Sequence, residues 1–233
     1  ETHLVETEPS DGILPRPVPF SVVYEDDDIL VVDKPADTPI HPSIGNYENT
    51  LANGIAWYFE QKGEPFVYRC INRLDRDTTG LIVLAKHALS AAVLSQAMRS
   101  REIHRTYQAF ALGETAASGT IDAPIARLNG SLIQRTVDFA SGERSVTHYR
   151  TLAHCSVFSH LELNLETGRT HQIRVHMAYI GHPLLGDTLY NKTPGTFPRQ
   201  ALHSASLSFV HPITGEPLNF HAPLPEDMQN LLT

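Results

Sequence analysis

Residues 72–80 read NRLDRDTTG and alternate two arginines with two aspartates in front of the apolar run LIVLAK. Asp75 has an arginine on each side, which favours the charged form of its carboxyl group, so we expect its pKa to be lowered. Such a carboxylate is a poor general base near neutral pH but can act as a nucleophile or an electrostatic stabiliser. The alternative is a surface loop of ion pairs, each contributing roughly 0–1 kcal/mol. The motif alone favours neither interpretation.

A second polar segment reads LETGRTHQIRVHMAYIGHPLLGD. Three of its residues are predicted to cap a helix: Thr167, Gly168 and Thr170. The first turns of that helix would carry Arg169, His171 and Arg174, and cations at a helix N-terminus favour an anionic group. The alternative is that these side chains pair with Asp or Glu of the protein. A metal site is not favoured, because His171 and His176 are five residues apart and no HExxH pattern occurs.

Two further segments carry candidate residues. IHRTYQAFALG contains Tyr107, which can stack on a nucleobase, although an aromatic residue on a strand more often belongs to the core. VVDKPADTPIHPS contains Lys34 and His41 in a proline-rich loop, which equally fits the exit of a hairpin.

The elements that must position these residues are mostly strands. Short apolar and β-branched runs predict a hairpin in FSVVYEDDDILVVDKP, a buried strand in GLIVLAK, a strand in HRTYQAFALG, two antiparallel strands within residues 143–168 and a hairpin in LSFVHPITGEPLNFHAP. Helical spacing predicts helices in NTLANGIAWYFEQKG, ALSAAVLSQAMRS and RTHQIRVHMAYIG. Helices and strands do not alternate regularly, so we predict an α+β fold with a mixed, mostly antiparallel β-sheet core flanked by helices and loops.

Composition restricts the class of protein. The chain has 233 residues, enough for one large domain, and no apolar run approaches the roughly 18 residues that a membrane span requires. Its two cysteines form no disulfide framework, which favours a reducing cytoplasm. The net charge is −8, but ten of the 26 acidic residues and only two of the 18 basic ones lie in residues 1–37. Residues 69–107 hold seven basic and three acidic residues, which permits a basic face that meets phosphate; a mixed-charge surface is the plainer alternative.

Four segments together resemble the RluA-type RNA pseudouridine synthases: VVDKPADTPIHPS, NRLDRDTTGLIVLAK, ETGRTHQIRVHMAYIGHPLLGDTLY and ALHSASLSFVHPITGEPLNFHAPLP. They follow the order of that family's motifs from about Phe20 to Pro225. The resemblance implies a pseudouridine synthase catalytic domain over residues 19–233. It also implies isomerisation of specific uridines in structured RNA, with neither cofactor nor metal. Ribosomal RNA is the preferred substrate and transfer RNA the other candidate.

The resemblance also implies roles for single residues. Asp75 is the implied nucleophile, which attacks either uracil carbon 6 or ribose carbon 1′ of a flipped uridine. Arg174 is implied to pair with Asp75, and Tyr107 to stack on the base and take the proton of carbon 5. Leu202 would pack against the uracil, and Arg76 would assist flipping. The cations and imidazoles named above complete the predicted substrate-binding set: Arg169, His171, Lys34 and His41.

The sequence departs from the family pattern at a few positions. Asn72 stands where many members have His, Thr79 where Ser is common, and PADT where PAG is usual. None of these changes removes a catalytic group.

Two rival functions are open. A non-catalytic RNA-binding domain of the same fold would be expected to lose Asp75 or Tyr107, and a hydrolase using Asp75 with His171 would need a nucleophile-elbow motif that this sequence lacks. Residues 1–18 are interpreted as an acidic tail or linker after an N-terminal RNA-binding domain. We expect a cytoplasmic monomer whose partner is RNA.

Overall fold

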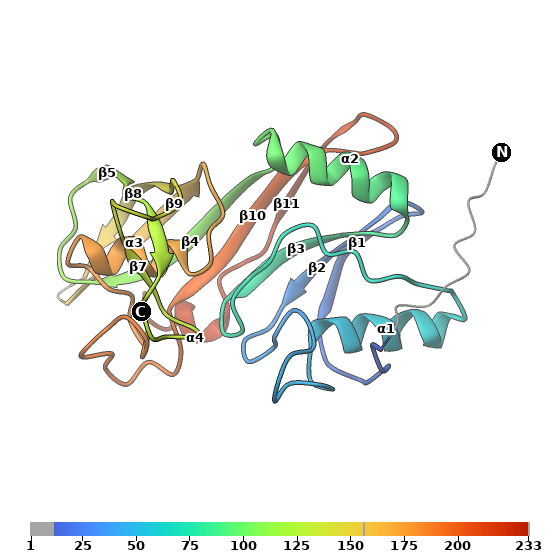
Figure 1. The fold of residues 1–233 in the computed structure, drawn as a ribbon, viewed down its shortest axis with the longest axis horizontal. Coiled ribbons are helices and arrows are strands. Elements are labelled where there is room, and N and C mark those ends of the chain that lie inside the picture. Colours follow the sequence, from blue (N-terminus) through green and yellow to red (C-terminus); the bar gives the residue numbers. More distant parts are fainter. Residues whose placement is uncertain (1–11, 156, 233) are drawn as a thin grey trace. The chain divides into compact units, whose positions relative to one another are not determined.

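The computed structural model describes residues 12–155 and 157–232, which form two compact units. The first unit contains the described residues up to Ile103 together with Ser206–Ala222, and the second contains His104–Ala205 and the described residues from Pro223 onward. Strand β10 (Leu202–Val210) begins in the second unit and ends in the first (Figure 1). The chain therefore returns to its first unit within a single strand.

The first unit is built around two strands, β2 (Ile29–Lys34) and β3 (Thr79–Ala85), that are buried on both faces. Its other elements are β1 (Ser21–Glu25), α1 (Leu51–Lys62), α2 (Ala88–Arg99), the end of β10 and β11 (Pro217–His221). Strand β2 pairs antiparallel with β1 and β3, and β10 pairs antiparallel with β11. Helices α1 and α2 lie on opposite faces of β2 and β3 (Figure 1). Two covered faces explain why residues 81–85, LIVLA, are all apolar instead of alternating with polar residues.

Helix α1 is fixed at both ends and along one side. Thr50 and Asn53 form a capping box at its start, and Gly63 ends it in the left-handed conformation at φ 69°. The predicted helix and its stop at Gly63 are thus confirmed. The described part of the predicted tail bonds to this helix: Arg16 N–H donates to Asn53 C=O at 3.1 Å, and Asn53 Nδ2 donates to Leu14 C=O at 2.8 Å. Residues 1–11 of that tail lie outside the described residues.

A partly buried ion cluster joins β1 to α1 and to the end of β3. The carboxylate of Glu25 accepts hydrogen bonds from Tyr58 Oη at 2.6 Å, Lys62 Nζ at 2.7 Å and Lys86 Nζ at 3.0 Å. Burial opposes its ionisation, but the three donors outweigh that effect and lower the pKa of Glu25 to about 2.

The second unit is an antiparallel sheet with a small separate hairpin. Its elements are β4 (His104–Leu112), β5 (Ser118–Asp122), β6 (Ile125–Arg127), β7 (Arg135–Val137), β8 (Val146–His154), β9 (Phe158–Leu165), α3 (Gln172–Tyr179) and α4 (Glu226–Gln229). The strand order is β4-β9-β8-β5, β6 pairs with β7, and α3 contacts β7 and β8. The predicted pairing of β8 with β9 is confirmed.

The predicted α+β class with a mixed, mostly antiparallel sheet is confirmed, since the strand pairs of known register are antiparallel and the helices are few. Among the described residues, no helix has the length and apolar character to cross a membrane.

Candidate active site

Asp75 lies in a tight loop directly before β3. Its backbone carbonyl accepts a hydrogen bond from Thr78 N–H at 3.1 Å, which closes a turn over residues 75–78. The side chain of Asp75 is half-buried, whereas Leu74 before it is buried and Arg76 after it is exposed. The loop therefore places the carboxylate at the beginning of a fully buried strand, whose packing restricts where it can lie.

The ammonium group of Lys34 holds this loop from inside. Lys34 is 0% exposed, and its Nζ donates to the carbonyls of Pro35 at 2.7 Å, Thr38 at 3.0 Å and Arg76 at 2.7 Å. These charge-assisted bonds offset part of the free energy needed to strip the ammonium group of water. The sequence predicts Lys34 as a substrate ligand, whereas the structure uses its ammonium group to tie the loop of Asp75 to β2.

Asn72 attaches the other side of the loop to β3. Its Nδ2 donates to Leu81 C=O at 3.2 Å, and its Oδ1 accepts from Val83 N–H at 2.9 Å. The side-chain amide thus pairs with the strand as a backbone peptide group would. An imidazole carries no such adjacent donor and acceptor, so the departure at position 72 has a structural role.

The exposed residues near this loop are held weakly. Arg76 lies 3.2 Å from Asp77 Oδ2 through Nη2 and 3.6 Å from Asp37 Oδ1 through Nε, and 56% of its side chain is exposed. Exposed pairs of this kind contribute little, so the guanidinium remains available to a phosphate. The imidazole of His41 packs edge-on against Tyr68, with ring centroids 4.6 Å apart.

In the second unit, Arg174 is held by a carboxylate that the sequence analysis did not single out. Its Nε donates to Asp187 Oδ2 at 2.7 Å and its Nη2 to Asp187 Oδ1 at 2.9 Å. Arg174 is 7% exposed and Asp187 0%, and the ring of Tyr190 lies 5.1 Å from the guanidinium carbon. The bidentate pair and the ring together fix the plane of the guanidinium. The sequence feature that could have drawn attention to Asp187 is its position directly after Gly186 in the segment GHPLLGDTLY.

Helix α3 begins differently from the prediction. Its N-cap is His171, which has φ 59° and makes no side-chain capping bond. The predicted capping by Thr167, Gly168 and Thr170 is wrong. The reason is that Thr167 Oγ1 donates to the side chain of Gln172 at 2.8 Å and accepts from Val146 N–H at 2.9 Å, so it ties the helix to β8. Nδ1 of His171 lies 2.8 Å from Tyr190 Oη.

The remaining predicted residues also lie in the second unit. Arg169 is exposed and its Nη1 lies 2.5 Å from Glu143 Oε2, so the alternative of internal pairing applies to both Arg169 and Arg174. Tyr107 on β4 and Leu202 at the start of β10 are each 4% exposed. The structure thus brings Lys34 to the loop of Asp75 and Arg76 in the first unit, and His171 and Arg174 to Tyr190 in the second.

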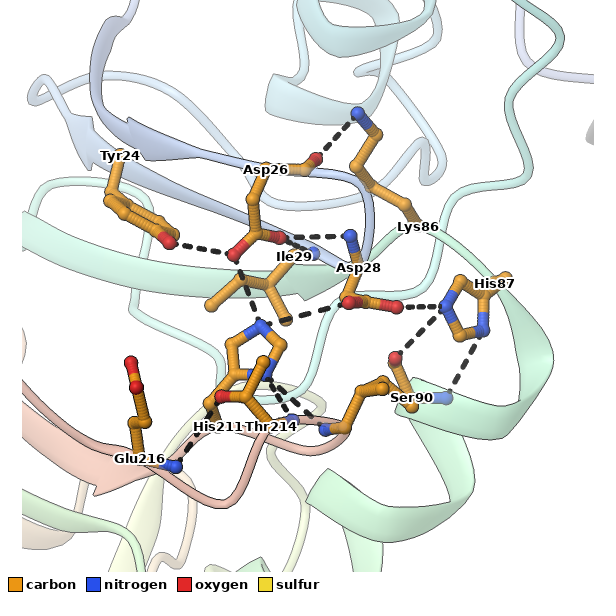
Figure 2. Close-up of polar contacts among 11 residues, drawn as sticks. Tyr24, Asp26, Asp28, Ile29, Lys86, His87, Ser90, His211, Thr214 and Glu216 are labelled. Carbon is orange, nitrogen blue, oxygen red and sulfur yellow. Dashed lines mark hydrogen bonds and ion pairs between the residues drawn. The ribbon is translucent and has the colours of Figure 1, made fainter. Parts of the chain in front are cut away.

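Among the described residues, one group has the types and spacing of metal ligands: Asp26, Asp28 and His211, with ligand atoms within 4.8 Å of one another. Figure 2 shows this group between the turn that joins β1 to β2 and the turn that joins β10 to β11.

The atoms of this group that could bind a metal already form hydrogen bonds within the protein. Nδ1 of His211 accepts from Thr214 N–H at 3.0 Å, so the neutral ring carries its proton on Nε2, 3.0 Å from Asp26 Oδ2. Asp26 also accepts from Tyr24 Oη at 2.7 Å and from Asp28 N–H at 2.8 Å. A metal at Nε2 would require the ring proton on Nδ1, which would remove the acceptor of the Thr214 N–H, so we assign the group to holding the two turns together.

The relatives of the chain agree on one family. Residues 28–179 match the sequence model of a family described as RNA pseudouridylate synthase. A Bacillus subtilis protein named "Uncharacterized RNA pseudouridine synthase YjbO" is 44% identical over 228 residues, which are 97% of this chain and 80% of the relative. "Ribosomal large subunit pseudouridine synthase D" of Vibrio cholerae is 44% identical over 227 residues, 91% of this chain and 69% of the relative. The solved structure of "Human RNA Pseudouridylate Synthase Domain Containing 1" has a TM-score of 0.74 at 26% identity, covering 93% of this chain and 86% of that one.

Proposed function

The chain belongs to the RNA pseudouridylate synthase family and is thus an isomerase acting on RNA; we propose that its substrate is ribosomal RNA and that Asp75 is its nucleophile. The observation that carries the proposal is the loop of Asp75. Lys34 and Asn72 fix it from two sides to a buried sheet, although it contains a half-buried carboxylate. A nucleophile needs such a fixed position, whereas a solvated charged loop does not.

In the proposed reaction, a uridine leaves the RNA stack and Asp75 attacks it at uracil carbon 6 or at ribose carbon 1′. The bond between uracil nitrogen 1 and ribose carbon 1′ breaks, and the base is rejoined to carbon 1′ through carbon 5. The bond to Asp75 is released, carbon 5 loses its proton and nitrogen 1 gains one. Tyr107 is the proposed acceptor of the proton from carbon 5 and the platform for the base. Extruding a base requires a few kcal/mol, least where it is already unpaired, so RNA loops are the expected targets.

Arg174 is the proposed ionic partner of Asp75. A guanidinium keeps its charge at every accessible pH, and it aims its donors only if its plane is fixed. The contacts with Asp187 and Tyr190 supply this orientation within the second unit. They support the proposal because an arginine that only balanced the charge of Asp187 would not need a ring against its face.

Ribosomal RNA is proposed over transfer RNA because several relatives are named ribosomal large subunit synthases. We also propose a cytoplasmic location. Cys70 and Cys155 are free, and burial raises the pKa of the Cys70 thiol to about 12, which keeps that thiol protonated and unreactive.

The test is pseudouridine mapping on RNA transcribed in vitro, with large-subunit ribosomal RNA and a transfer RNA pool compared. We expect wild type to modify ribosomal RNA, Asp75→Asn to form no pseudouridine, and both to melt at the same temperature. Asp27→Asn is the matched control, because Asp27 is an exposed aspartate of the same unit. Turnover by Asp75→Asn would refute the assignment of Asp75 as nucleophile. Modification of transfer RNA alone would refute ribosomal RNA as the substrate. If wild type binds RNA without modifying it, the chain is a non-catalytic RNA-binding domain.

A further inference from the structure

We propose that the groove between the β6–β7 hairpin and α3 is a nucleotide subsite for a residue of the RNA other than the isomerised uridine. The inference rests on the proposed function, in which RNA is the substrate. Asp75, Tyr107 and Leu202 are not among the residues that line this groove. The groove lies wholly in the second unit.

The groove has the size and lining of a small-ligand site. Its volume is about 360 Å³, and ligand sites span roughly 300–1,000 Å³. One wall is formed by Arg135–Val137 and Phe139, and the other by Tyr190 and three residues of α3, Val175, Ala178 and Tyr179. The lining is mostly apolar and carries one cation, which suits a base attached to a phosphate.

Two aromatic side chains of this groove face solvent. Phe139 is 69% exposed and Tyr179 is 54% exposed, with ring centroids 6.5 Å apart and planes inclined by 57°. Paired exposed rings are unusual on a surface that stays in water. Aromatic faces of this kind are where unstacked bases of RNA bind.

The hairpin beside the groove carries two arginines for which the described part of the chain offers no acidic partner. Arg127 on β6 is directly opposite Arg135 on β7, so the two side chains leave the same face of the hairpin. Among the described residues, no carboxylate lies within 4 Å of either guanidinium; Arg135 Nη1 donates only to the backbone carbonyls of Ile133 and Gln134. Like charges directly opposite each other destabilise a strand pair, and a bound phosphate would relieve this.

Across the described chain, several other arginines of the same unit have acidic partners, in contrast to the two arginines of the hairpin. Ion pairs within this unit join Arg144 to Glu166, Arg150 to Glu162 and Arg169 to Glu143. The unbalanced positive charge of the hairpin favours an anionic occupant. RNA carries a negative charge at every phosphate, whereas this chain carries 18 basic residues beside its 26 acidic ones, so RNA matches the hairpin better than a second copy of the chain does.

The groove shares a residue with the surroundings of Arg174. Tyr190 lines the groove, its Oη accepts from Arg135 N–H at 2.8 Å, and its ring packs against the guanidinium of Arg174. A nucleotide bound in the groove would contact the same tyrosine that orients Arg174. RNA that fills the subsite should therefore be converted faster than RNA that does not.

The experiment measures binding of unmodified large-subunit ribosomal RNA across a potassium chloride series, in an Asp75→Asn background that blocks turnover. The double variant Arg127→Gln with Arg135→Gln should lose two phosphate contacts. The logarithm of its binding constant should then fall less steeply with the logarithm of the salt concentration, by about 1.4 in the magnitude of the slope. Phe139→Ala should weaken binding roughly 5- to 150-fold through lost stacking and leave the slope unchanged. Arg150→Gln is the matched control, because it removes an exposed arginine that already pairs with Glu162. Thermal melting verifies that each variant is folded.

If the folded variants bind RNA with the affinity and the salt slope of the Arg150→Gln control, the proposal that the groove is a nucleotide subsite is wrong. Changes in self-association of these variants without changes in RNA binding would do the same, since the groove would then be a protein interface. Failure of the proposed function is separate: wild type would form no pseudouridine, while the two binding signatures of the groove would still be measurable.

Discussion

Replacing Lys34 by methionine separates support of the nucleophile loop from contact with RNA. Methionine has a similar length and volume but cannot donate hydrogen bonds. The carbonyl of Arg76 would keep the N–H of Thr38, 3.1 Å away, whereas those of Pro35 and Thr38 would lose the donor seen here. The perturbation is therefore confined to the inside of the loop.

The expected magnitude follows from these contacts. A buried carbonyl without a donor costs about 1–3 kcal/mol, so two cost about 2–6 kcal/mol. Methionine has no ammonium group that must be stripped of water on folding, so the variant avoids that cost and loses less free energy than the two carbonyls alone would imply. We expect the free energy of unfolding of Lys34→Met to fall by about 1–4 kcal/mol. Because a shift of the loop by about 1 Å misplaces Asp75, kcat should fall by roughly 10- to 100-fold.

The assays are urea denaturation and initial rates of pseudouridine formation against RNA concentration. Lys192→Met is the control, because Lys192 is exposed and the free energy of unfolding should change by less than about 0.5 kcal/mol. A lower kcat at nearly constant KM would support the positioning role. A raised KM at unchanged kcat would refute it and restore the prediction that Lys34 binds substrate, and wild-type stability of Lys34→Met would refute the estimate of the lost contacts.

Three further predictions concern stability. Asp187→Ala removes the bidentate partner of buried Arg174 and should lower the free energy of unfolding by about 3–5 kcal/mol in urea, with a smaller loss for Asp187→Asn, which keeps an oxygen acceptor. Asn72→Ala removes two hydrogen bonds to β3 and should cost roughly 2–6 kcal/mol by the same assay; a loss below 1 kcal/mol would mean that water replaces the amide. The pKa of Glu25 falls from 4.5 to about 2 on folding, so its ionised carboxylate contributes at most about 3 kcal/mol to the free energy of unfolding. This contribution is present above pH 4.5 and is lost as the pH falls towards 2. Glu25→Gln should therefore flatten the decline of stability with pH in that interval.

Features encoded by local sequence could be predicted, and features that depend on distant partners could not. Helix α1 follows from apolar spacing and from Gly63, and the strand β3 follows from its uninterrupted apolar run. The pair of Arg174 with Asp187 could not be derived, because the two residues are 13 positions apart and the segment between them includes Gly186, whose φ of 68° redirects the chain. The sequence contains 26 acidic candidates and no local rule that selects one.

The start of α3 and the hairpin β6–β7 were missed for different reasons. The positive φ of His171 is an uncommon backbone state for a residue other than glycine, so a threonine cap was the better local choice. Strands β6 and β7 have three residues each, too few for an alternating pattern to be recognised.

The net charge of −8 is a poor guide to RNA binding because much of the acidic charge is already engaged within the first unit. The carboxylate of Glu25 is neutralised by two lysines. Asp26 accepts a hydrogen bond from His211 across the two turns of Figure 2, and Asp28 accepts one from His87 at the N-cap of α2. Such groups project little field beyond a Debye length of about 8 Å. The charges that decide affinity for phosphate are cations without an acidic partner. Within residues 12–155 and 157–232, no carboxylate pairs with Arg127 or Arg135. An acidic chain can therefore bind RNA through one hairpin, and removing two charges from that hairpin should change the salt dependence more than removing a paired arginine elsewhere.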